Sequence, residues 1–371
     1  MENIPLSLYI HFPWCRKKCP YCDFNSLEIQ SDSLIPEYVL ALESDLKSEL
    51  INEKRNELVS IFLGGGTPSL IPGTELNGLF KTIGDKFEFL NAEITIEANP
   101  GSSEFSNFRD YQFLGINRLS IGVQTFSERA LKKIGRIHNS SDIENAFDLA
   151  RRASFENINV DIMYGLPDQT AAEAIDDLDK AIALDPEHIS WYELTIEPNT
   201  LFFKNPPNIP SDIRKERMFE AGKEKLLAAG YDQYEISAYA KAGKQSKHNT
   251  NYWEFGDYLG IGAGAHGKLT KTSEISRTKK TRNPRDYLIN RRSLTEKIKS
   301  EELLTEFLMN TLRLTNGFDL SLFEQRCYQD RSNLGPFLAK ALDKNLIKVE
   351  NDRVIPTEKG SLFLNELILL A

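Results

Sequence analysis

Three of the chain's four cysteines, Cys15, Cys19 and Cys22, lie within eight residues in a C-x3-C-x2-C spacing. Thiolates are the usual ligands of iron–sulfur clusters, and three of them hold three irons of a [4Fe-4S] cubane. The fourth iron then has no protein ligand and is open to a cofactor that coordinates it and accepts an electron. The spacing therefore predicts a reaction centre at this loop, with the three cysteines as its metal ligands.

Two other uses of clustered cysteines fit this sequence less well. A structural zinc site usually needs four ligands in a closed tetrahedron, and His11 is the nearby residue that would supply the fourth. Disulfides lack a natural pairing, because three cysteines are clustered and Cys327 is distant. Cys327 falls in a predicted helix, where we expect a buried, small apolar side chain. We therefore favour an iron–sulfur cluster over zinc or disulfides.

The composition is that of a globular protein from a reducing interior. Of the 371 residues, 40% are hydrophobic and 27% are charged, which suits one large and one small domain. The N-terminal residues show no basic stretch before an apolar core, and no apolar run approaches the roughly twenty residues that span a bilayer. Few cysteines and an iron–sulfur ligand set argue for a reducing compartment. We expect a cytoplasmic protein.

Short β-branched runs alternate with longer amphipathic stretches in the first part of the chain. This alternation is typical of βαβ units and a parallel sheet, and six units are too few for a complete eight-fold barrel. The expected fold class is therefore α/β, with a partial, open (βα)6 barrel. The predicted strands are 7–11, 59–63, 93–97, 118–123, 159–163 and 188–194, and the predicted helices include 35–52, 127–134, 143–154 and 171–184.

The pattern changes after residue 205, and we expect three units. Residues 1–205 would form the barrel with the cluster site, and 206–290 an extension with a basic connector. Residues 291–371 would form a C-terminal α+β domain, in which three helices precede a hairpin, as in winged-helix domains. Its predicted elements are helices at 301–313, 320–328 and 334–344, strands at 347–350 and 353–356, and an amphipathic segment at 361–370.

Chemically distinctive residues stand at the carboxyl ends of the predicted strands. The cysteine loop follows the first strand, the glycine-rich run 64–69 follows the second, and Glu97 ends the third. Gln124, Asp161 and Glu193 lie at or near the ends of the remaining three. Barrel folds gather their chemistry at this end of the strands, so we expect one shared site.

The net charge of −9 argues against general nucleic-acid binding, but one segment is strongly basic. Between Lys268 and Lys299 there are eleven Lys or Arg residues against three acidic ones. Charge runs are most often solvated faces, so a solvated connector is the first interpretation. The alternative is a cradle for an anionic partner, such as porphyrin propionates, a membrane surface or an acidic protein.

The glycine run after the second strand lets the backbone approach a ligand closely, because glycine has no Cβ. A phosphate-binding loop would need a lysine that is missing here. Together with the cysteine spacing, this run resembles the radical S-adenosylmethionine (SAM) superfamily. The resemblance implies that Gly65, Gly66 and Thr67 cradle the methionine amino group of SAM. Glu97 would then accept a hydrogen bond from a ribose hydroxyl or from the amino group.

Three further segments, 118–126, 131–138 and 159–170, resemble the oxygen-independent coproporphyrinogen III oxidases and their relatives. The match runs from residue 9 to about residue 253, and more loosely to the C-terminus. The resemblance implies a SAM pocket in which Arg136 faces a carboxylate, whose geometry a guanidinium fork matches. The other pocket residues that it implies are Tyr9, Tyr21, Gln124 and Asp161.

The sequence departs from the oxidases at one position. The oxidases have a further cysteine two residues after the third ligand, whereas this chain has Phe24, which puts porphyrinogen decarboxylation in doubt. The Cys-Asp-Phe ending and residues 248–253 instead resemble the HemW-type heme chaperones, whose HNxxYW motif is associated with heme. Imidazole is a common axial ligand of heme iron, so His248 is the candidate heme contact and His266 a weaker second. An exposed polar histidine on a loop is the alternative for His248.

The leading hypothesis is a heme chaperone that binds a [4Fe-4S] cluster, SAM and heme, and delivers heme to recipient proteins. The alternative is a radical SAM enzyme acting on a porphyrinogen or another substrate, as an oxidase-like enzyme or a methyltransferase. Phe24 speaks against coproporphyrinogen III oxidase activity, whereas SAM cleavage, and with it enzyme status, stays open. The sequence also leaves open whether heme-receiving partners lie at the membrane and whether the chain forms a homodimer. Nucleic-acid binding is disfavoured, because the predicted helix at 334–344 has only two lysines.

Overall fold

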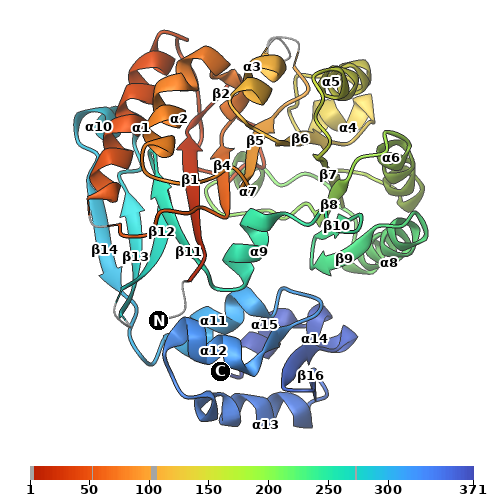
Figure 1. Cartoon of the computed structure of the whole chain (residues 1–371). Helices are drawn as coiled ribbons and strands as arrows, with labels where there is room; N and C mark the ends of the chain where they lie inside the picture. Colours follow the sequence, from red (N-terminus) through yellow and green to blue (C-terminus); the bar gives the residue numbers. More distant parts are fainter. Residues whose placement is uncertain (1–3, 52, 102–106, 272–273) are drawn as a thin grey trace.

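The computed structural model describes residues 4–51, 53–101, 107–271 and 274–371. Within these residues, twelve strands form one sheet in the order β14-β13-β12-β11-β1-β4-β5-β6-β7-β8-β10-β9 (Figure 1). A separate three-stranded sheet, β15-β17-β16, belongs to the C-terminal part of the chain, which lies below the large sheet in Figure 1.

Six consecutive parallel strands form the centre of the large sheet, so the expected partial (βα)6 barrel is confirmed. Each of these strands pairs in parallel with the next one along the chain. All six strands that the sequence predicts are present, and each ends within two residues of its predicted bounds. The strands are β1 (Leu6–Phe12), β4 (Ser60–Gly65), β5 (Glu93–Ala98), β6 (Arg118–Gln124), β7 (Ile158–Tyr164) and β8 (His188–Glu193).

Helices between the strands cover the outer face of this barrel (Figure 1). Their starting points follow from the sequence: α5 and α6 both begin with a capping box, formed by Asn139 with Asp142 and by Thr170 with Glu173. The helices are α1 (Leu34–Leu50), α2 (Asn77–Gly84), α3 (Phe108–Phe113), α4 (Glu128–Lys133), α5 (Ser140–Arg152), α6 (Ala171–Ala183) and α8 (Asp212–Ala228). The short helix α7 (Leu201–Lys204) instead contacts the cysteine loop, where the Phe202 amide donates to the Pro20 carbonyl.

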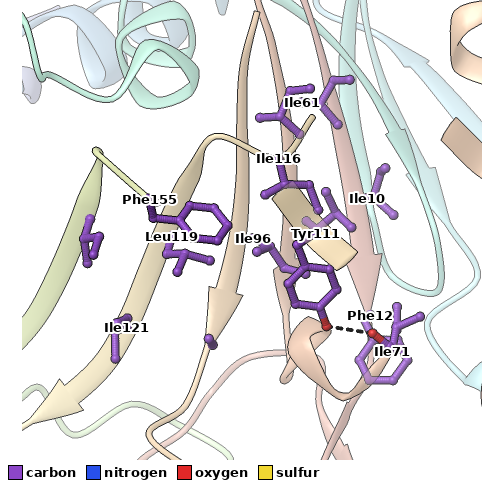
Figure 2. Close-up of a cluster of buried hydrophobic side chains, with 14 of the residues drawn as sticks. Ile10, Phe12, Ile61, Ile71, Ile96, Tyr111, Ile116, Leu119, Ile121 and Phe155 are labelled. Atoms are coloured by element: carbon purple, nitrogen blue, oxygen red, sulfur yellow. Dashed lines mark hydrogen bonds between the residues drawn. The ribbon is translucent and has the colours of Figure 1, made fainter. Parts of the chain in front are cut away.

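Alternation along the strands separates an apolar face from a polar one. Successive side chains of a strand point to opposite faces, and the apolar set packs outward against the helices. Figure 2 shows Ile10, Ile61, Ile96 and Leu119 from four neighbouring strands within one buried cluster, which also contains Tyr111 of α3. The other set, which faces into the barrel, is rich in polar residues. The fold therefore turns its polar strand residues toward a common interior.

Both edges of the barrel carry additional strands. β11 (Asp257–Ile261) pairs in parallel with β1, and it is followed by the antiparallel strands β12 (His266–Lys271), β13 (Glu274–Lys280) and β14 (Ser293–Lys297). At the opposite edge, β10 (Ala238–Ala240) and β9 (Asp232–Glu235) pair antiparallel beyond β8.

The basic segment 268–299 is therefore part of the sheet and not a connector, although most of its basic side chains are exposed, as expected for a solvated face. It forms most of β12, all of β13 and β14, and helix α10 (Pro284–Ile289). Two of its lysines, Lys268 and Lys280, are buried in ion pairs with Asp257 and Asp45. The sequence prediction failed because a run of charges does not reveal which lysines have buried carboxylate partners.

The C-terminal part has the expected three helices followed by a hairpin. Its own apolar core is centred on residues such as Phe307, Phe323 and Phe337. Its elements are α11 (Leu303–Thr311), β15 (Phe318–Asp319), α12 (Leu320–Cys327), α13 (Gly335–Asp343), β16 (Ile347–Glu350), β17 (Arg353–Pro356), α14 (Glu358–Leu362) and α15 (Leu364–Ile368). Cys327 is buried in this core, as predicted. Among all helices in the described ranges, we find none with the length and apolarity that crossing a membrane requires.

Candidate cofactor site

The cysteine loop leaves the barrel directly after β1 and is closed by a short strand pair. β2 (Trp14–Cys15) pairs with β3 (Leu27–Glu28), so the residues between them form a loop with fixed ends. Cys15, Cys19 and Cys22 are all half-buried, and none is in a disulfide. Burial, with a smaller contribution from the other two cysteines, raises the pKa of the Cys15 thiol to about 11. A bound metal centre would reverse this preference, because a coordinating thiol is deprotonated outright.

In this structure, His11 is not placed to be the fourth ligand that a zinc site would need. His11 is buried, and both of its ring nitrogens already have partners: Nδ1 is 2.9 Å from the Tyr9 hydroxyl and Nε2 is 3.0 Å from the Asn25 carbonyl oxygen. In the described ranges, no three His, Cys, Asp or Glu side chains converge closely enough to hold a single metal ion. His11 therefore supports the loop and is not placed as a ligand.

One pocket of about 680 Å³ adjoins the cysteine loop at the carboxyl ends of the barrel strands. Its volume lies in the range of cofactor sites in proteins. Eleven of the thirteen site residues that the sequence predicts line this pocket. They are Cys15, Cys19, Tyr21, Cys22, Gly65, Gly66, Thr67, Glu97, Gln124, Arg136 and Asp161.

The glycine run packs against the start of the cysteine loop. Gly65 has a φ of +112°, which favours glycine, and a Cβ on Gly66 would lie 2.5 Å from the Trp14 carbonyl oxygen. The amide groups are already used, because Gly66 donates to the Phe12 carbonyl and Thr67 donates to the Trp14 carbonyl. An ammonium group entering here would therefore meet carbonyl and hydroxyl oxygens, which are the acceptors that it requires.

Glu97 and Asp161 bring two carboxylates into the pocket. Glu97 Oε2 accepts a hydrogen bond from the Gly65 amide at 2.9 Å. Burial, with the neighbouring Asp161 charge, raises the pKa of Glu97 to about 7. Burial also raises the pKa of Asp161, although Asn159 and Ser120 donate hydrogen bonds to it. Two carboxylates of this kind favour a ligand that brings hydrogen-bond donors or positive charge.

Arg136 lies at the cluster end of the pocket. Its Nη1 is 3.8 Å from Cys19 Sγ, and its Nη2 donates to the Asn99 side chain and to the Gly122 carbonyl. Its Nε is buried and has no hydrogen-bond partner. A guanidinium donor without a hydrogen-bond partner in a pocket suits a carboxylate ligand, which is what the resemblance to the oxidases implies for Arg136.

Gln124 reaches the pocket because β6 is irregular where it pairs with β7. The register shifts between Ile121 and Gln124, and Gln124 takes a φ of +71°. Bulges of this kind re-aim a side chain, and here the Gln124 Oε1 accepts a hydrogen bond of 2.7 Å from the Tyr192 hydroxyl. Tyr21 packs on the opposite side of the loop, with its ring 6.4 Å from that of Phe202.

The two predicted residues outside the pocket lining, Tyr9 and His248, contact each other behind it. His248 lies on helix α9 (Lys247–Trp253) and not on an exposed loop, so the structure corrects that alternative. Its ring packs 4.9 Å from the Phe62 ring and 6.2 Å from the Tyr9 ring, and Nδ1 is 2.9 Å from the Ser60 hydroxyl. Burial, with the Arg118 charge nearby, lowers the pKa of His248 to about 3. The imidazole is therefore neutral, the form that ligates iron, but it faces the barrel wall.

Helix α9 closes the amino-terminal end of the barrel, opposite the cysteine loop. The Asn251 side chain donates to the Ser7 hydroxyl at 2.9 Å, and the His248 amide donates to Glu93 at 3.2 Å. Ser7 and Glu93 both lie at the start of their strands. The same helix presents Asn249 and Trp253 to the pocket, which therefore runs from the cysteine loop to α9.

Several pocket residues escaped the sequence analysis. Ser190 and Tyr192 alternate on the inward face of a strand that was predicted, so strand periodicity offered a signal for both. Glu235 and Arg313 come from β9 and from just beyond α11, and no pattern in the sequence links them to the pocket. Phe24, which replaces the oxidases' further cysteine, lies at the pocket and is 59% exposed.

Comparison with known proteins places this site in a family. Residues 9–181 match the profile described as the radical SAM superfamily, and residues 298–363 match the HemN C-terminal domain. The heme chaperone HemW of Haemophilus influenzae is 47% identical, over 99% of this chain and 97% of that protein. The heme chaperones HemW of Escherichia coli and Bacillus subtilis are 46% and 36% identical over similar shares. The chain belongs to the HemW family.

The fold of this HemW-family chain is also that of a solved structure, coproporphyrinogen III oxidase (HemN) from Escherichia coli. The TM-score is 0.83, and the match covers 99% of this chain and 90% of that one. The sequence identity is 22%, so this likeness shows the fold alone.

The residues of the pocket fit the cofactors for which the radical SAM superfamily is named. Three thiols at one end provide soft ligands for a [4Fe-4S] cluster. Next to them, the unpaired Arg136 Nε suits a carboxylate, and the buried Glu97 and Asp161 suit donor groups. In this HemW-family chain, the pocket therefore offers a donor that suits the carboxylate of SAM and acceptors that suit its amino and hydroxyl groups.

Proposed function

We propose that this protein is a heme chaperone that binds a [4Fe-4S] cluster, SAM and heme, and delivers heme to recipient proteins. The observation that carries the proposal is the 47% identity to a protein named heme chaperone HemW across nearly the whole chain. Phe24 supports it, because this position holds no further thiol beside the cluster ligands. The reducing compartment that suits half-buried cluster thiols is the cytoplasm.

The chain's own residues would hold the cofactors in fixed places. Cys15, Cys19 and Cys22 would ligate the cluster, which supplies an iron open to SAM. Arg136 would pair with the SAM carboxylate, and Glu97 would accept from its donor groups. This set fixes one end of the pocket and leaves the end at α9 for the cargo.

Heme contact at His248 remains part of the proposal and has a structural condition. The neutral imidazole suits iron, but its Nδ1 is bonded to Ser60 and its ring packs on Phe62. Ligation through His248 therefore requires the ring to turn or α9 to shift. His266 is exposed at the start of β12, three residues after Ala263, whose carbonyl accepts a hydrogen bond from the loop residue Asn25, so it is the competing ligand.

The first test is an anaerobic heme titration of cluster-reconstituted protein, followed by the Soret band. We expect saturation near one heme per chain, a weaker Soret shift in His248→Ala, and an unchanged one in His266→Ala. Saturation that depends on His266 instead would keep the chaperone and relocate the ligand. No saturable binding would refute the proposal.

A second test separates delivery from binding. Heme-loaded protein is mixed with increasing apomyoglobin, and the transfer rate is recorded. A chaperone that hands heme over directly gives a rate that rises with acceptor concentration, whereas simple release gives a constant rate. In parallel, coproporphyrinogen III incubated with SAM and reductant should remain unconsumed.

A further inference from the structure

The end of the pocket away from the cysteine loop is built by three segments that are distant in the sequence. Glu235 comes from β9, Trp253 from the end of α9, and Arg313 follows α11 of the C-terminal part. Figure 1 shows α9 lying between the barrel and the C-terminal part. A cationic side chain from one part of the molecule thus enters a pocket formed by the other.

Arg313 is held in this place by its backbone. Its carbonyl accepts a hydrogen bond of 3.1 Å from the Ile236 amide, and Leu314 forms an antiparallel bridge with Glu235. Thr315 continues the contact by donating to the Tyr234 carbonyl at 3.0 Å. The position of Arg313 is therefore set by strand-like pairing with the barrel edge and not by its side chain.

The side chains at this end have unused hydrogen-bonding capacity. The Arg313 guanidinium lies 4.3 Å from the centre of the Trp253 ring, and its Nη2 is 3.7 Å from Glu235 Oε2. At this distance the two side chains form an ion pair but no hydrogen bond. Arg313 Nε, Glu235 Oε2 and Trp253 Nε1 are all buried and have no hydrogen-bond partner.

Three buried polar atoms without a hydrogen-bond partner, one of them in the Arg313–Glu235 ion pair, surround one end of the cavity and point to a ligand. Buried polar groups in native proteins are overwhelmingly paired, so each exception calls for a partner. Glu235 is only 4% exposed, and burial raises its pKa. The free donors belong to a guanidinium and an indole, so the group that satisfies both is an acceptor, and a planar anion fits the guanidinium fork best.

We propose that Arg313 binds a carboxylate of the heme cargo at the α9 end of the pocket. This inference rests on the proposed function and deepens it. Heme carries two propionates, and Arg136 at the opposite end stands next to the cluster ligand Cys19. The two arginines thus divide the pocket into a SAM carboxylate site and a propionate site. Trp253 then offers an apolar surface beside the propionate site.

The test compares heme with its dimethyl ester, in which both propionates lose their charge. Dissociation constants are measured anaerobically for wild type, Arg313→Ala, Arg313→Lys and the control Arg152→Gln, an exposed residue of α5. A charge-assisted contact predicts that wild type binds the ester roughly 10- to 100-fold more weakly than heme. Arg313→Ala should bind both ligands equally weakly, and Arg313→Lys should keep part of the difference, because lysine retains the charge without the fork. Arg152→Gln should match wild type.

The outcomes separate this inference from the function on which it rests. Equal affinity of wild type for heme and ester overturns the carboxylate site, and it needs no variant to fold. A heme–ester difference that survives in Arg313→Ala, or disappears in Arg152→Gln, also overturns it. Absence of any heme binding by wild type overturns the chaperone proposal itself. SAM affinity and the cluster absorbance, measured for each variant, should equal those of wild type; loss of SAM affinity with Arg313→Ala would instead assign the carboxylate to SAM.

Discussion

At the scale of single residues, the fold raises the pKa of one carboxyl group in the pocket, that of Glu97, well above its ordinary value. Glu97 accepts one hydrogen bond, from the Gly65 amide, and Asp161 is its charged neighbour. An unfolded glutamate ionises near pH 4.5, whereas the folded Glu97 keeps its proton to about pH 7. Between these values the folded state binds more protons than the unfolded state. Stability from this group is therefore lost as the pH rises through the interval.

Replacing Glu97 by Gln should remove this dependence. We expect the unfolding free energy of ligand-free wild type to fall, relative to Glu97→Gln, by at most about 3 kcal/mol between pH 4.5 and pH 8. Anaerobic urea denaturation at several pH values measures the difference. The control is Glu197→Gln, which also lines the pocket. Parallel pH profiles for Glu97→Gln and wild type would contradict the raised pKa.

At the scale of elements, the carboxyl end of β4 supports the cysteine loop. The Gly66 amide bonds to Phe12 at the end of β1, and a Cβ on Gly66 would lie 2.5 Å from the Trp14 carbonyl oxygen of β2. Gly66→Ala should therefore displace β2, lower the unfolding free energy by about 1–3 kcal/mol and reduce the iron bound per chain. The control is Gly335→Ala, where a Cβ meets nothing within 4 Å, so stability should change by less than about 1 kcal/mol. Full iron content in Gly66→Ala would show that the loop does not depend on this contact.

Helix α9 depends on Asn251 for its attachment to the barrel. The buried Asn251 amide donates to the Ser7 hydroxyl and to the Asp257 carbonyl. Asn251→Ala leaves both acceptors without this donor and should cost about 1–3 kcal/mol in urea denaturation. Asn249→Ala changes a residue of the same helix that lines the pocket, and it should leave stability nearly unchanged. Equal losses in both variants would mean that α9 is held by its side-chain volume and not by these hydrogen bonds.

The elements differ in how far the sequence predicts them. The six barrel strands were predictable because apolar, β-branched runs mark strands that are buried on one face by helices. The strands β12 to β14 were missed because their charged residues conceal the strand pattern, and α9 was taken for a loop because its seven residues are too short for a clear helical period. The pocket was predictable because its residues Glu97 and Asp161 lie at or near the carboxyl ends of predicted strands. The place of Arg313 in the pocket was not predictable, since it depends on how the C-terminal part pairs with β9.

At the scale of the whole molecule, buried ion pairs attach the added strands to the barrel helices. Lys280 of β13 lies 2.5 Å from Asp45 of α1, and both side chains are 1% exposed. It also pairs with Glu49 one turn later. Asp45 in turn accepts a hydrogen bond of 2.7 Å from Tyr287 of α10. Asp45 thus joins α1 to β13 and α10, two neighbouring elements of the basic segment that lie far from α1 in the sequence.

Two adjacent lysines provide a matched test of this role. Lys280→Met removes the only cation that the described residues pair with Asp45, and an uncompensated buried carboxylate costs about 3–5 kcal/mol. Lys279→Met makes the same substitution at the neighbouring residue, which is exposed, and should shift the unfolding free energy by less than about 0.5 kcal/mol. Urea denaturation at pH 7 compares the two. Similar small losses would mean that water reaches Asp45 and that β13 is held by its strand pairing alone. The expected difference would instead make β13 part of the core through Lys280, with the exposed basic residues of the segment, such as Lys279 and Arg282, left for a partner.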